Sequence, residues 1–182
     1  MTIGTLNSLD RNAFVQAIGW VFEQSPWVAE RAWRRRPFSS VADLHAALVD
    51  EMNSAGSELQ LALLRAHPDL GARMRMSDAS TGEQSGAGLD RLTPRDFDRL
   101  QRSNGEYRRK FGFPFLFAVK GSTPAQILEA MQERLTRDPE SEFAEGLRQV
   151  ARIAWFRLEE AIGPAVDGSG VDALLPGSSN SR

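Results

Sequence analysis

Apolar residues recur along most of this chain at the spacing of one face of an α-helix. In the first clear case the apolar positions fall at i, i+3, i+4, i+7 and i+8, and they are Phe14, Ala17, Ile18, Val21 and Phe22. Ser8 precedes this run and is the expected N-cap. A second helix is predicted from Ser39 or Ser40, with an apolar face formed by Val41, Leu44, Leu48 and Met52.

Proline marks the boundaries of four more predicted helices. The apolar run of residues 59–64 ends at His67 and Pro68, because the residue before a proline avoids the helical region. Thr93, Thr123 and Asp138 each precede a proline, which is the pattern of an N-cap followed by the first helical residue. The helices that begin after Thr93 and Thr123 have these expected inward residues: Phe97, Leu100, Asn104 and Tyr107 in the first, and Ile127, Leu128, Met131 and Leu135 in the second. The helix after Asp138 is the longest, at about 139–162.

No stretch shows sustained alternation of apolar and polar residues, which would indicate strands. The one extended candidate is residues 111–119, which Pro114 interrupts. From Gly163 onward the composition changes to Gly, Ser, Pro and Asp, which is typical of a loose tail. The sequence therefore predicts an all-α, single-domain helical bundle over residues 1–162 and a flexible tail over residues 163–182.

Composition excludes several classes of protein. The chain has 182 residues and no cysteine, so disulfides, zinc ribbons and thiol nucleophiles are excluded, and a cytoplasmic location is expected. The net charge of −2 argues against a nucleic-acid-binding protein. No apolar run approaches the roughly 20 residues of a membrane helix. One basic cluster with interleaved tryptophans is interpreted as a solvated helix face; it contains Trp27, Arg31, Trp33, Arg34, Arg35 and Arg36.

His67 is the candidate group for proton transfer. The chain has two histidines and one tyrosine, so few side chains titrate near pH 7. Pro68 restricts His67 to extended backbone at the end of a helix, where the imidazole can face a cleft. The alternative is a histidine that only ends the helix and hydrogen-bonds to a carbonyl group.

Arg157 falls on the apolar side of the last helix. That side is traced by Phe143, Leu147, Val150, Ala154 and Ala161, and at about 100° per residue Arg157 lies inside the arc toward one edge. A buried, unpaired charge is very costly. Arg157 therefore either forms an internal ion pair, extends outward to solvent, or binds a carboxylate or urea-like ligand with its planar guanidinium.

Two more segments contain polar groups and glycines whose presence is not explained by helix formation alone. Ser80 and Glu83 have the spacing of a capping box, but Gln84 and the glycines at 82, 86 and 88 suit a helix start that binds a polar ligand. The aromatic residues of segment 111–119 lie on a backbone whose polar groups need partners if it is buried. Those partners are either other protein groups or a ligand.

Together these segments resemble the 2-oxo-4-hydroxy-4-carboxy-5-ureidoimidazoline (OHCU) decarboxylases, the enzymes that complete the conversion of urate to (S)-allantoin. The resemblance spans about residues 9–158. Its motifs occur in the family's order and approximate spacing: Ser-Pro-Trp-Val-Ala-Glu from Ser25, Arg-Pro-Phe from Arg36, His-Pro-Asp-Leu from His67, Glu-Gln-x-x-Ala-Gly-Leu from Glu83, Lys-Phe-Gly-Phe-Pro-Phe from Lys110, and Arg157-Leu158.

The resemblance implies an all-helical fold and a decarboxylation that uses neither metal nor cofactor. By position, His67 matches the catalytic histidine, and Glu83 would set its protonation. The substrate-binding residues implied are Pro68, Ser80, Thr81, Gly82, Glu83, Gln84, Phe115, Leu116, Phe117, Ala118, Val119 and Arg157. The chain departs from the family pattern at Gly82, where a larger residue is usual, and at Ser103-Asn104-Gly105.

The expected partner is a small-molecule substrate, with no nucleic acid and no membrane, and a homodimer is compatible with the sequence. One alternative function is a non-catalytic helical module that binds a ureide or a protein. Another is an interaction domain built on Trp20, Trp27, Trp33 and Trp155, although these tryptophans are better explained as core.

Overall fold

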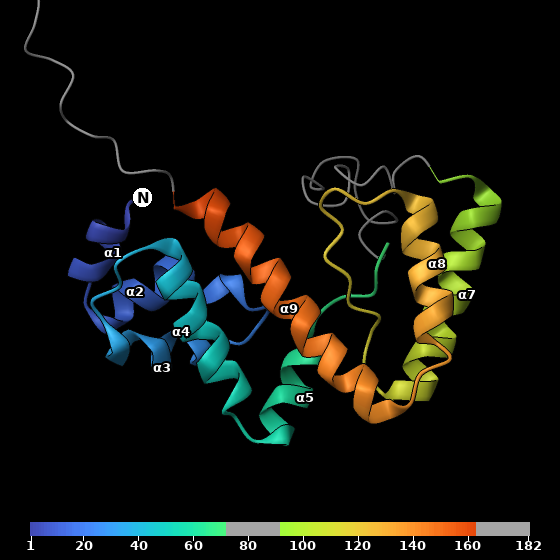
Figure 1. Cartoon of the computed structure of the whole chain (residues 1–182), viewed down its shortest axis with the longest axis horizontal. Coiled ribbons are helices and arrows are strands. Elements are labelled where there is room, and N and C mark those ends of the chain that lie inside the picture. Colours follow the sequence, from blue (N-terminus) through green and yellow to red (C-terminus); the bar gives the residue numbers. More distant parts are fainter. Residues whose placement is uncertain (72–91, 163–182) are drawn as a thin grey trace, which may run out of the picture.

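The computed structural model describes residues 1–71 and 92–162, and every regular element in these ranges is a helix (Figure 1). In chain order the α-helices are α1 (Ile3–Ser8), α2 (Arg11–Ile18), α3 (Trp27–Ala32), α4 (Val41–Asn53), α5 (Ser57–Ala66), α7 (Pro94–Phe111), α8 (Pro124–Arg134) and α9 (Pro139–Ala161). Two short 3₁₀ helices, η1 (Gly19–Val21) and η2 (Trp33–Arg35), follow α2 and α3. The all-α prediction is confirmed.

The predicted helix starts are confirmed where a capping residue precedes a proline. The side chains of Thr93, Thr123 and Asp138 each accept a hydrogen bond from the backbone N–H three residues later, and a proline follows each of them. Thr123 also forms a full capping box with Gln126. Ser40 caps α4 in the same way.

The start of α2 was predicted wrongly. Asp10, whose carboxylate accepts from the Ala13 N–H, caps this helix. Ser8 is instead the last residue of α1, where its hydroxyl donates to the Thr5 carbonyl. The predicted apolar face is correct nonetheless, because Phe14, Ile18, Val21 and Phe22 are all buried although the α-helix itself ends at Ile18.

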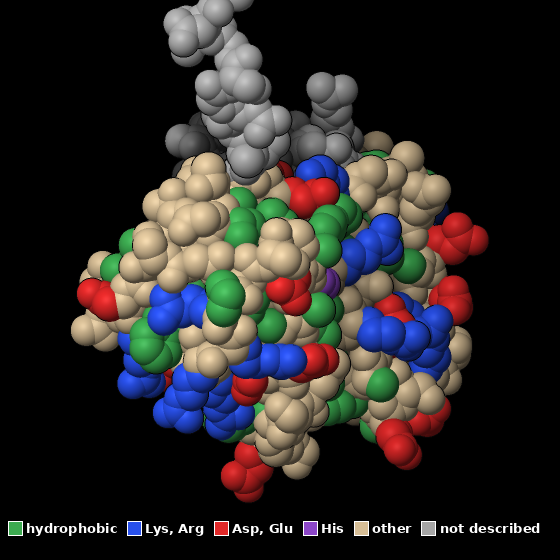
Figure 2. Space-filling model, turned by 60° about the vertical axis from the view of Figure 1, so that its left-hand side comes forward, with side chains coloured by type: hydrophobic (Ala, Val, Ile, Leu, Met, Phe, Trp, Pro, Cys, Tyr) green, Lys and Arg blue, Asp and Glu red, His purple; other side chains and the backbone are tan. Residues whose placement is uncertain are grey.

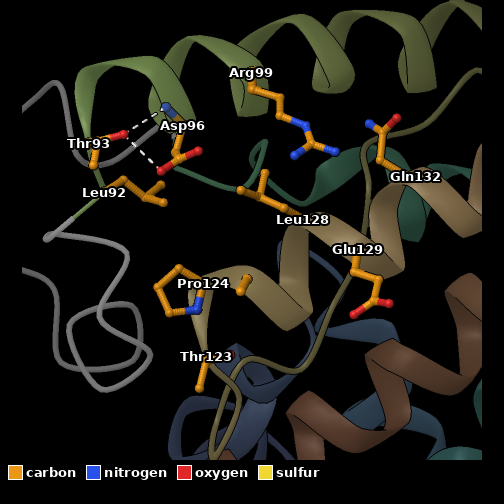
Figure 3. A pocket seen from close by; sticks show the side chains of 10 residues that line it. Leu92, Thr93, Asp96, Arg99, Thr123, Pro124, Leu128, Glu129 and Gln132 are labelled. Atoms are coloured by element: carbon orange, nitrogen blue, oxygen red, sulfur yellow. Dashed lines mark hydrogen bonds between the residues drawn. The ribbon is translucent and has the colours of Figure 1, made fainter.

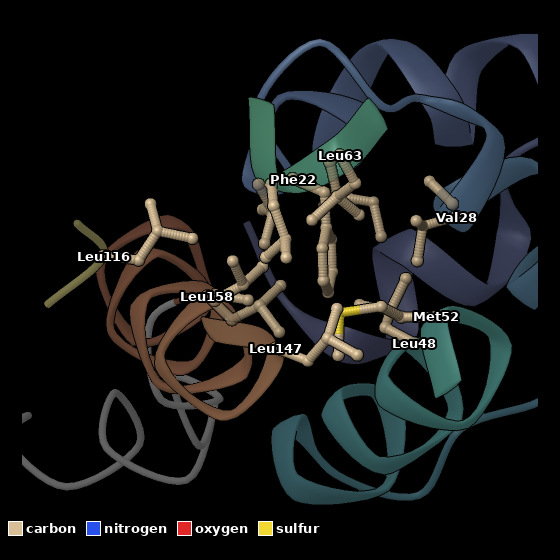
Figure 4. Packing of buried hydrophobic residues seen from close by; sticks show 14 of the residues in the cluster. Phe22, Val28, Leu48, Met52, Leu63, Leu116, Leu147 and Leu158 are labelled. Carbon is tan, nitrogen blue, oxygen red and sulfur yellow. The ribbon is translucent and has the colours of Figure 1, made fainter. Parts of the chain in front are cut away.

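Helix α9 runs diagonally through the molecule, with α1 to α5 on one side and α7 and α8 on the other (Figure 1). It contacts α4, α5, α7 and η1. The side that faces α4 and η1 is a close-packed apolar core (Figure 4), and its largest members include Phe14, Phe22, Leu44, Leu48, Met52 and Leu63. Leu116 packs on the opposite side of α9 from Phe22 and Met52 (Figure 4).

The tryptophans do not all belong to this core. Trp20 is 51% exposed, so its assignment to the core was wrong. The chain changes from α-helix to the tighter η1 at Gly19, and the Trp20 indole N–H donates to the Ala17 carbonyl at the surface. Trp27 and Trp33 are half-buried, and Arg31 and Arg36 stack on their rings.

The extended segment begins two residues later than predicted. Phe111 is the last residue of α7, and Gly112 ends the helix with a left-handed backbone (φ 78°). From Phe113 to Val119 the chain has no regular structure and lies beside α9. Side chains two apart share a face, since the rings of Phe115 and Phe117 stack with centroids 5.9 Å apart, as in an extended chain.

Among the described helices, none is long and apolar enough to cross a membrane.

Candidate active site

His67 ends α5, as the sequence predicts. Its backbone is extended (φ −74°, ψ 140°) and its side chain is only 5% exposed. Nδ1 lies 2.9 Å from the Leu63 carbonyl oxygen. Because a carbonyl can only accept, Nδ1 carries a proton, and in the neutral form of the ring Nε2 is the basic nitrogen. The structure thus contains the carbonyl contact of the helix-ending alternative, and that contact also fixes the tautomer that a proton-transfer group needs.

The residues after His67 are tied to α7. The Asp69 carboxylate lies 3.0 Å from Arg108 Nε and 2.9 Å from its Nη2. The Leu70 carbonyl accepts from the buried side chain of Asn104 at 2.8 Å. These bonds hold the His-Pro-Asp-Leu run against α7 and explain the inward position of Asn104, while Pro68 is exposed.

The end of α5 also meets α9 and the start of the extended segment. Arg65 Nε donates to the Gly112 carbonyl at 2.8 Å. A Cβ atom at Gly146 of α9 would lie 3.3 Å from both Leu64 and Phe113. This close approach favours glycine at position 146 and brings three parts of the chain together near His67.

Residues 115–119, called the strip below, have protein partners for part of their backbone. The Leu116 carbonyl accepts from Arg134 Nη1 at 2.7 Å, and the Ala118 N–H donates to Gln149 Oε1 at 2.9 Å. The strip continues along α9, since Lys120 just beyond it lies over the Phe156 ring and 3.8 Å from the Glu160 carboxylate. Arg157 therefore belongs to the same stretch of α9 as the far end of the strip.

Arg157 is 8% exposed and pairs within the protein. Its Nη1 donates to the Val21 carbonyl at 3.1 Å, and its Nη2 lies 3.3 Å from the Glu23 carboxylate. Of the three explanations given above, the structure shows the internal ion pair. Binding of an anionic ligand remains compatible with it, because a guanidinium has five donor hydrogens.

A buried polar network next to the strip was not predicted. Tyr107 of α7, Arg134 of α8 and Glu142 of α9 are all buried, and the Glu142 carboxylate accepts from the Tyr107 hydroxyl and from Arg134. Burial raises the pKa of the Tyr107 phenol far above its usual range, although the Arg134 charge opposes this shift. The position of Arg134 offers a clue that was available in the sequence, since it lies three residues after the inward Met131.

Five predicted site residues lie outside the described residues: Ser80, Thr81, Gly82, Glu83 and Gln84. The choice between a capping box and a ligand-binding helix start therefore stays a prediction. The predicted tail over 163–182 also lies outside the described residues.

A separate pocket lies between the N-terminal ends of α7 and α8 (Figure 3). Its volume is about 550 Å³, and its lining includes Leu92, Asp96, Arg99, Leu128, Glu129 and Gln132. Asp96 is engaged by the Thr93 hydroxyl at 2.8 Å as part of the helix cap. Of the predicted site residues that the structure describes, none lines this pocket.

The basic cluster near the N-terminus is partly engaged by neighbouring groups. Arg35 pairs with Asp50 at 3.0 Å, and Arg36 donates to the Asn7 carbonyl at 2.8 Å. Figure 2 shows acidic side chains next to basic ones on this face. Within residues 1–71 and 92–162, no group of three or more His, Asp or Glu side chains is placed to hold a metal ion.

Known proteins are similar in sequence to this chain over nearly its whole length. A family model described as OHCU decarboxylase matches residues 7–159. The 2-oxo-4-hydroxy-4-carboxy-5-ureidoimidazoline decarboxylase of Haloferax volcanii is 48% identical over 160 residues, which are 88% of this chain and 95% of that protein. The protein of the same name from Halalkalicoccus jeotgali is 46% identical over 164 residues, 90% of this chain and 93% of its own.

Solved structures agree with the sequence comparison. The crystal structure of (S)-allantoin synthase superposes with a TM-score of 0.74 at 31% identity, over 89% of this chain and 54% of that one. An OHCU decarboxylase crystallised in the presence of (S)-allantoin has a TM-score of 0.65 at 24% identity, over 77% of this chain and 93% of that one, and supports the fold. Since the family model and relatives above 45% identity cover most of its length, this chain belongs to the OHCU decarboxylase family.

Proposed function

We propose that this protein decarboxylates OHCU to (S)-allantoin in the degradation of urate. The observation that carries the proposal is the match, at 48% identity and across 95% of its length, to a relative named for this reaction. The position of His67, buried at a helix end with one ring nitrogen fixed, supports a catalytic protein over a module that only binds.

The substrate itself can accept the electrons that decarboxylation releases. Its ring carries a hydroxyl and a carboxylate on one carbon, next to a ring carbon joined to nitrogen by a double bond. When the carbon–carboxylate bond breaks, carbon dioxide leaves and its bonding electron pair forms a double bond to the adjacent carbon, while the C=N electron pair moves to the nitrogen, which takes up a proton. The adjacent carbon then gains a proton as the hydroxyl becomes a carbonyl. The protein must therefore orient the carboxylate, bind the anion and deliver a proton to one face.

We assign these tasks to the residues implied by the family resemblance. His67, with Glu83, transfers the proton, a contribution of about 10²–10⁴-fold in rate. Arg157 binds the anionic part of the substrate, and the strip offers backbone groups to its ureido and amide groups. Pro68 forms a wall, and the side chains and backbone of Ser80, Thr81, Gly82 and Gln84 complete the polar contacts.

The test is the decay of freshly generated OHCU with and without the protein. We expect faster decay and a single enantiomer of allantoin, followed by circular dichroism. His67→Asn should lower kcat/KM by about 10²–10⁴-fold. Decay at the spontaneous rate with the wild-type protein would refute the proposal. A His67→Asn variant within about tenfold of wild type, which is about 1.4 kcal/mol, would remove His67 from the proton-transfer role.

The segment at 80–84 is tested separately. Glu83→Gln should reduce turnover far more than stability, whereas Ser80→Ala should cost about 1 kcal/mol of stability through a lost cap. If both variants have nearly wild-type turnover, the segment acts only as a capping box.

Three broader expectations belong to the same proposal. The absence of cysteine supports a cytoplasmic location. A homodimer is the candidate assembly, to be measured by sedimentation. Residues 163–182 form a tail outside the catalytic domain, and a chain ending at residue 162 should keep its activity.

A further inference from the structure

Within the described residues, side chains bind the backbone of the strip along one edge, and at its far end the Val119 carbonyl accepts from the Ser122 N–H at 2.9 Å. In an extended chain the N–H and C=O groups of successive residues point to opposite edges, so those of alternate residues share an edge. Leu116 and Ala118 are alternate residues, and the Leu116 carbonyl and the Ala118 N–H are the two groups that side chains of α8 and α9 bind. The edge that carries Leu116 and Ala118 is therefore the protein-facing edge.

Arg134 is well suited to fix this edge. Its Nη1 binds the Leu116 carbonyl at 2.7 Å, while its Nε donates to the Glu142 carboxylate at 2.7 Å. Its guanidinium also lies over the Phe115 ring, 4.6 Å from the centroid. Because Arg134, Tyr107 and Glu142 are all buried and bonded to one another, the position of the Leu116 carbonyl is set by three helices at once.

Gln149 fixes the second point. Its Oε1 accepts from the Ala118 N–H, and its Nε2 donates to Glu145 Oε1 at 2.7 Å. The contact with Glu145 orients the amide, so that its oxygen, and not its nitrogen, faces the strip. Gln149 is thus pre-oriented as an acceptor.

Phe117 lies between these two anchors on the opposite edge. Within residues 1–71 and 92–162, no hydrogen bond engages the backbone of Phe117. Phe117 is only partly buried, whereas its neighbours Leu116 and Ala118 are buried. Its N–H and C=O form a donor and acceptor pair, which matches the amide and ureido groups of the proposed substrate.

We propose that Arg134 and Gln149 are positioning residues for substrate binding. They bind Leu116 and Ala118 on one edge of the strip and thereby present the Phe117 N–H and C=O, on the other edge, to the ureide part of the substrate. The inference rests on the proposed function, and it assigns the substrate-binding role to one edge and one residue of the strip.

The test compares Gln149→Met with Gln132→Met. Gln149→Met removes the hydrogen bonds to the Ala118 N–H and to Glu145, whereas Gln132→Met removes a hydrogen bond to Ser103 Oγ at 2.9 Å, away from the strip. Gln149→Met should raise KM for OHCU and the Kd for (S)-allantoin, measured by calorimetry, by about tenfold. Its kcat should change less than its KM, because the interaction serves bound substrate and transition state alike. Gln132→Met should leave KM and Kd within about twofold of wild type and lower Tm by a similar amount.

Several results would overturn the inference. One is a Gln149→Met variant with wild-type KM and Kd, and another is an equal rise in KM for both variants. If Gln149→Met does not fold, Gln149→Ala, which also lacks an acceptor for the Ala118 N–H, takes its place and is judged by the same outcomes. A wild-type protein that does not accelerate OHCU decay refutes the proposed function, whereas an active wild type with unaffected Gln149 variants refutes only this inference.

Discussion

The two sides of α9 are stabilised by different kinds of interaction. Toward α1 to α5, the interior consists almost entirely of aliphatic and aromatic side chains, and Ser25 is one of its few buried polar residues. Toward α7 and α8, the interior includes Tyr107, Arg134 and Glu142, together with Ser103 and Asn104. Apolar contacts stabilise a fold without directing it closely, because they have no preferred orientation. The strip lies on the polar side, where hydrogen bonds define the position of individual backbone groups.

This difference predicts how each side responds to mutation. A buried ion pair adds little net stability over a well-packed apolar core, but removal of one partner leaves the other charged and unpaired. The apolar side should lose stability in proportion to the volume removed. The polar side should lose stability when a charge changes with almost no change in volume.

Glu142→Gln should have the largest effect. The substitution leaves the Arg134 charge buried without its carboxylate, so we expect a loss of about 3–5 kcal/mol in the free energy of unfolding. Leu48→Ala, on the apolar side, should cost about 2–5 kcal/mol by creating a cavity. Both are measured by urea denaturation. If the free energy of unfolding of Glu142→Gln is within about 1 kcal/mol of the wild-type value, neutral groups can replace the charged network. The two sides of α9 would then not differ in the way described.

Arg157→Met should have an intermediate effect on stability and a large one on binding. The partner carboxylate of Glu23 is 21% exposed, so water can solvate it when the pair is lost, and we expect a cost of about 1–3 kcal/mol. The KM for OHCU should rise strongly because an anion-binding guanidinium is removed.

Glu23→Gln is the matched variant for this pair. If Glu23 competes with the substrate for Arg157, Glu23→Gln should leave KM unchanged or lower. A large fall in Tm for Arg157→Met with an unchanged KM would show instead that Arg157 is structural.

His45→Ala should have a small effect. The Nε2 of His45, the second histidine of the chain, lies 2.8 Å from the Ala151 carbonyl, and its ring is edge-on to Trp155. Loss of this single hydrogen bond between α4 and α9 should cost about 1 kcal/mol, with kcat/KM unchanged. A fall in activity comparable to that of His67→Asn would show that proton transfer does not depend on His67 alone.

The smallest effect is expected from an exposed charge at the start of α9. The Ser141 N–H and hydroxyl hold the pKa of the Asp138 carboxyl below its ordinary value. A lowered folded-state pKa contributes stability above the unfolded pKa, and this contribution is lost as the pH falls below about 4. The Tm difference between wild type and Asp138→Asn should therefore be larger at pH 6 than at pH 3. A difference independent of pH would mean that the hydrogen bond matters and the charge does not.

The sequence was most informative where local rules decide the structure. A capping residue followed by proline placed the starts of α7, α8 and α9 correctly, and Pro68 placed His67 at the end of α5. The short α1 and α3 were missed, since each has six residues and too few apolar positions to define a period. The exposed Trp20 was assigned to the core because hydrophobicity alone does not reveal a change to 3₁₀ geometry at Gly19.

The polar network could not be predicted in the same way. Leu135 was expected to face inward at the end of α8, yet Arg134 is buried and Leu135 is only partly so. Acidic residues are common in the first turn of a helix, where they favour the macrodipole, so Glu142 carried no indication of burial. Only tertiary packing brings Tyr107 and the Leu116 carbonyl to the same guanidinium.

The single long helix α9 also limits how the length of this protein can change. Gly146, Gln149 and Arg157 lie on one uninterrupted rod, so their separations are multiples of about 1.5 Å per residue and each residue turns the next by about 100°. One residue inserted after Gln149 would rotate Arg157 away from Glu23 and Val21 while leaving Gln149 beside the strip. The connection between α8 and α9 is held by Lys110 Nζ at the Leu135 and Arg137 carbonyls, but these exposed hydrogen bonds do not set the rotation of α9. Insertions and deletions should therefore preserve the site when they lie before Asp138 and disrupt it when they lie within α9. The length and rotation of this helix thus fix the distances between the site residues that it carries.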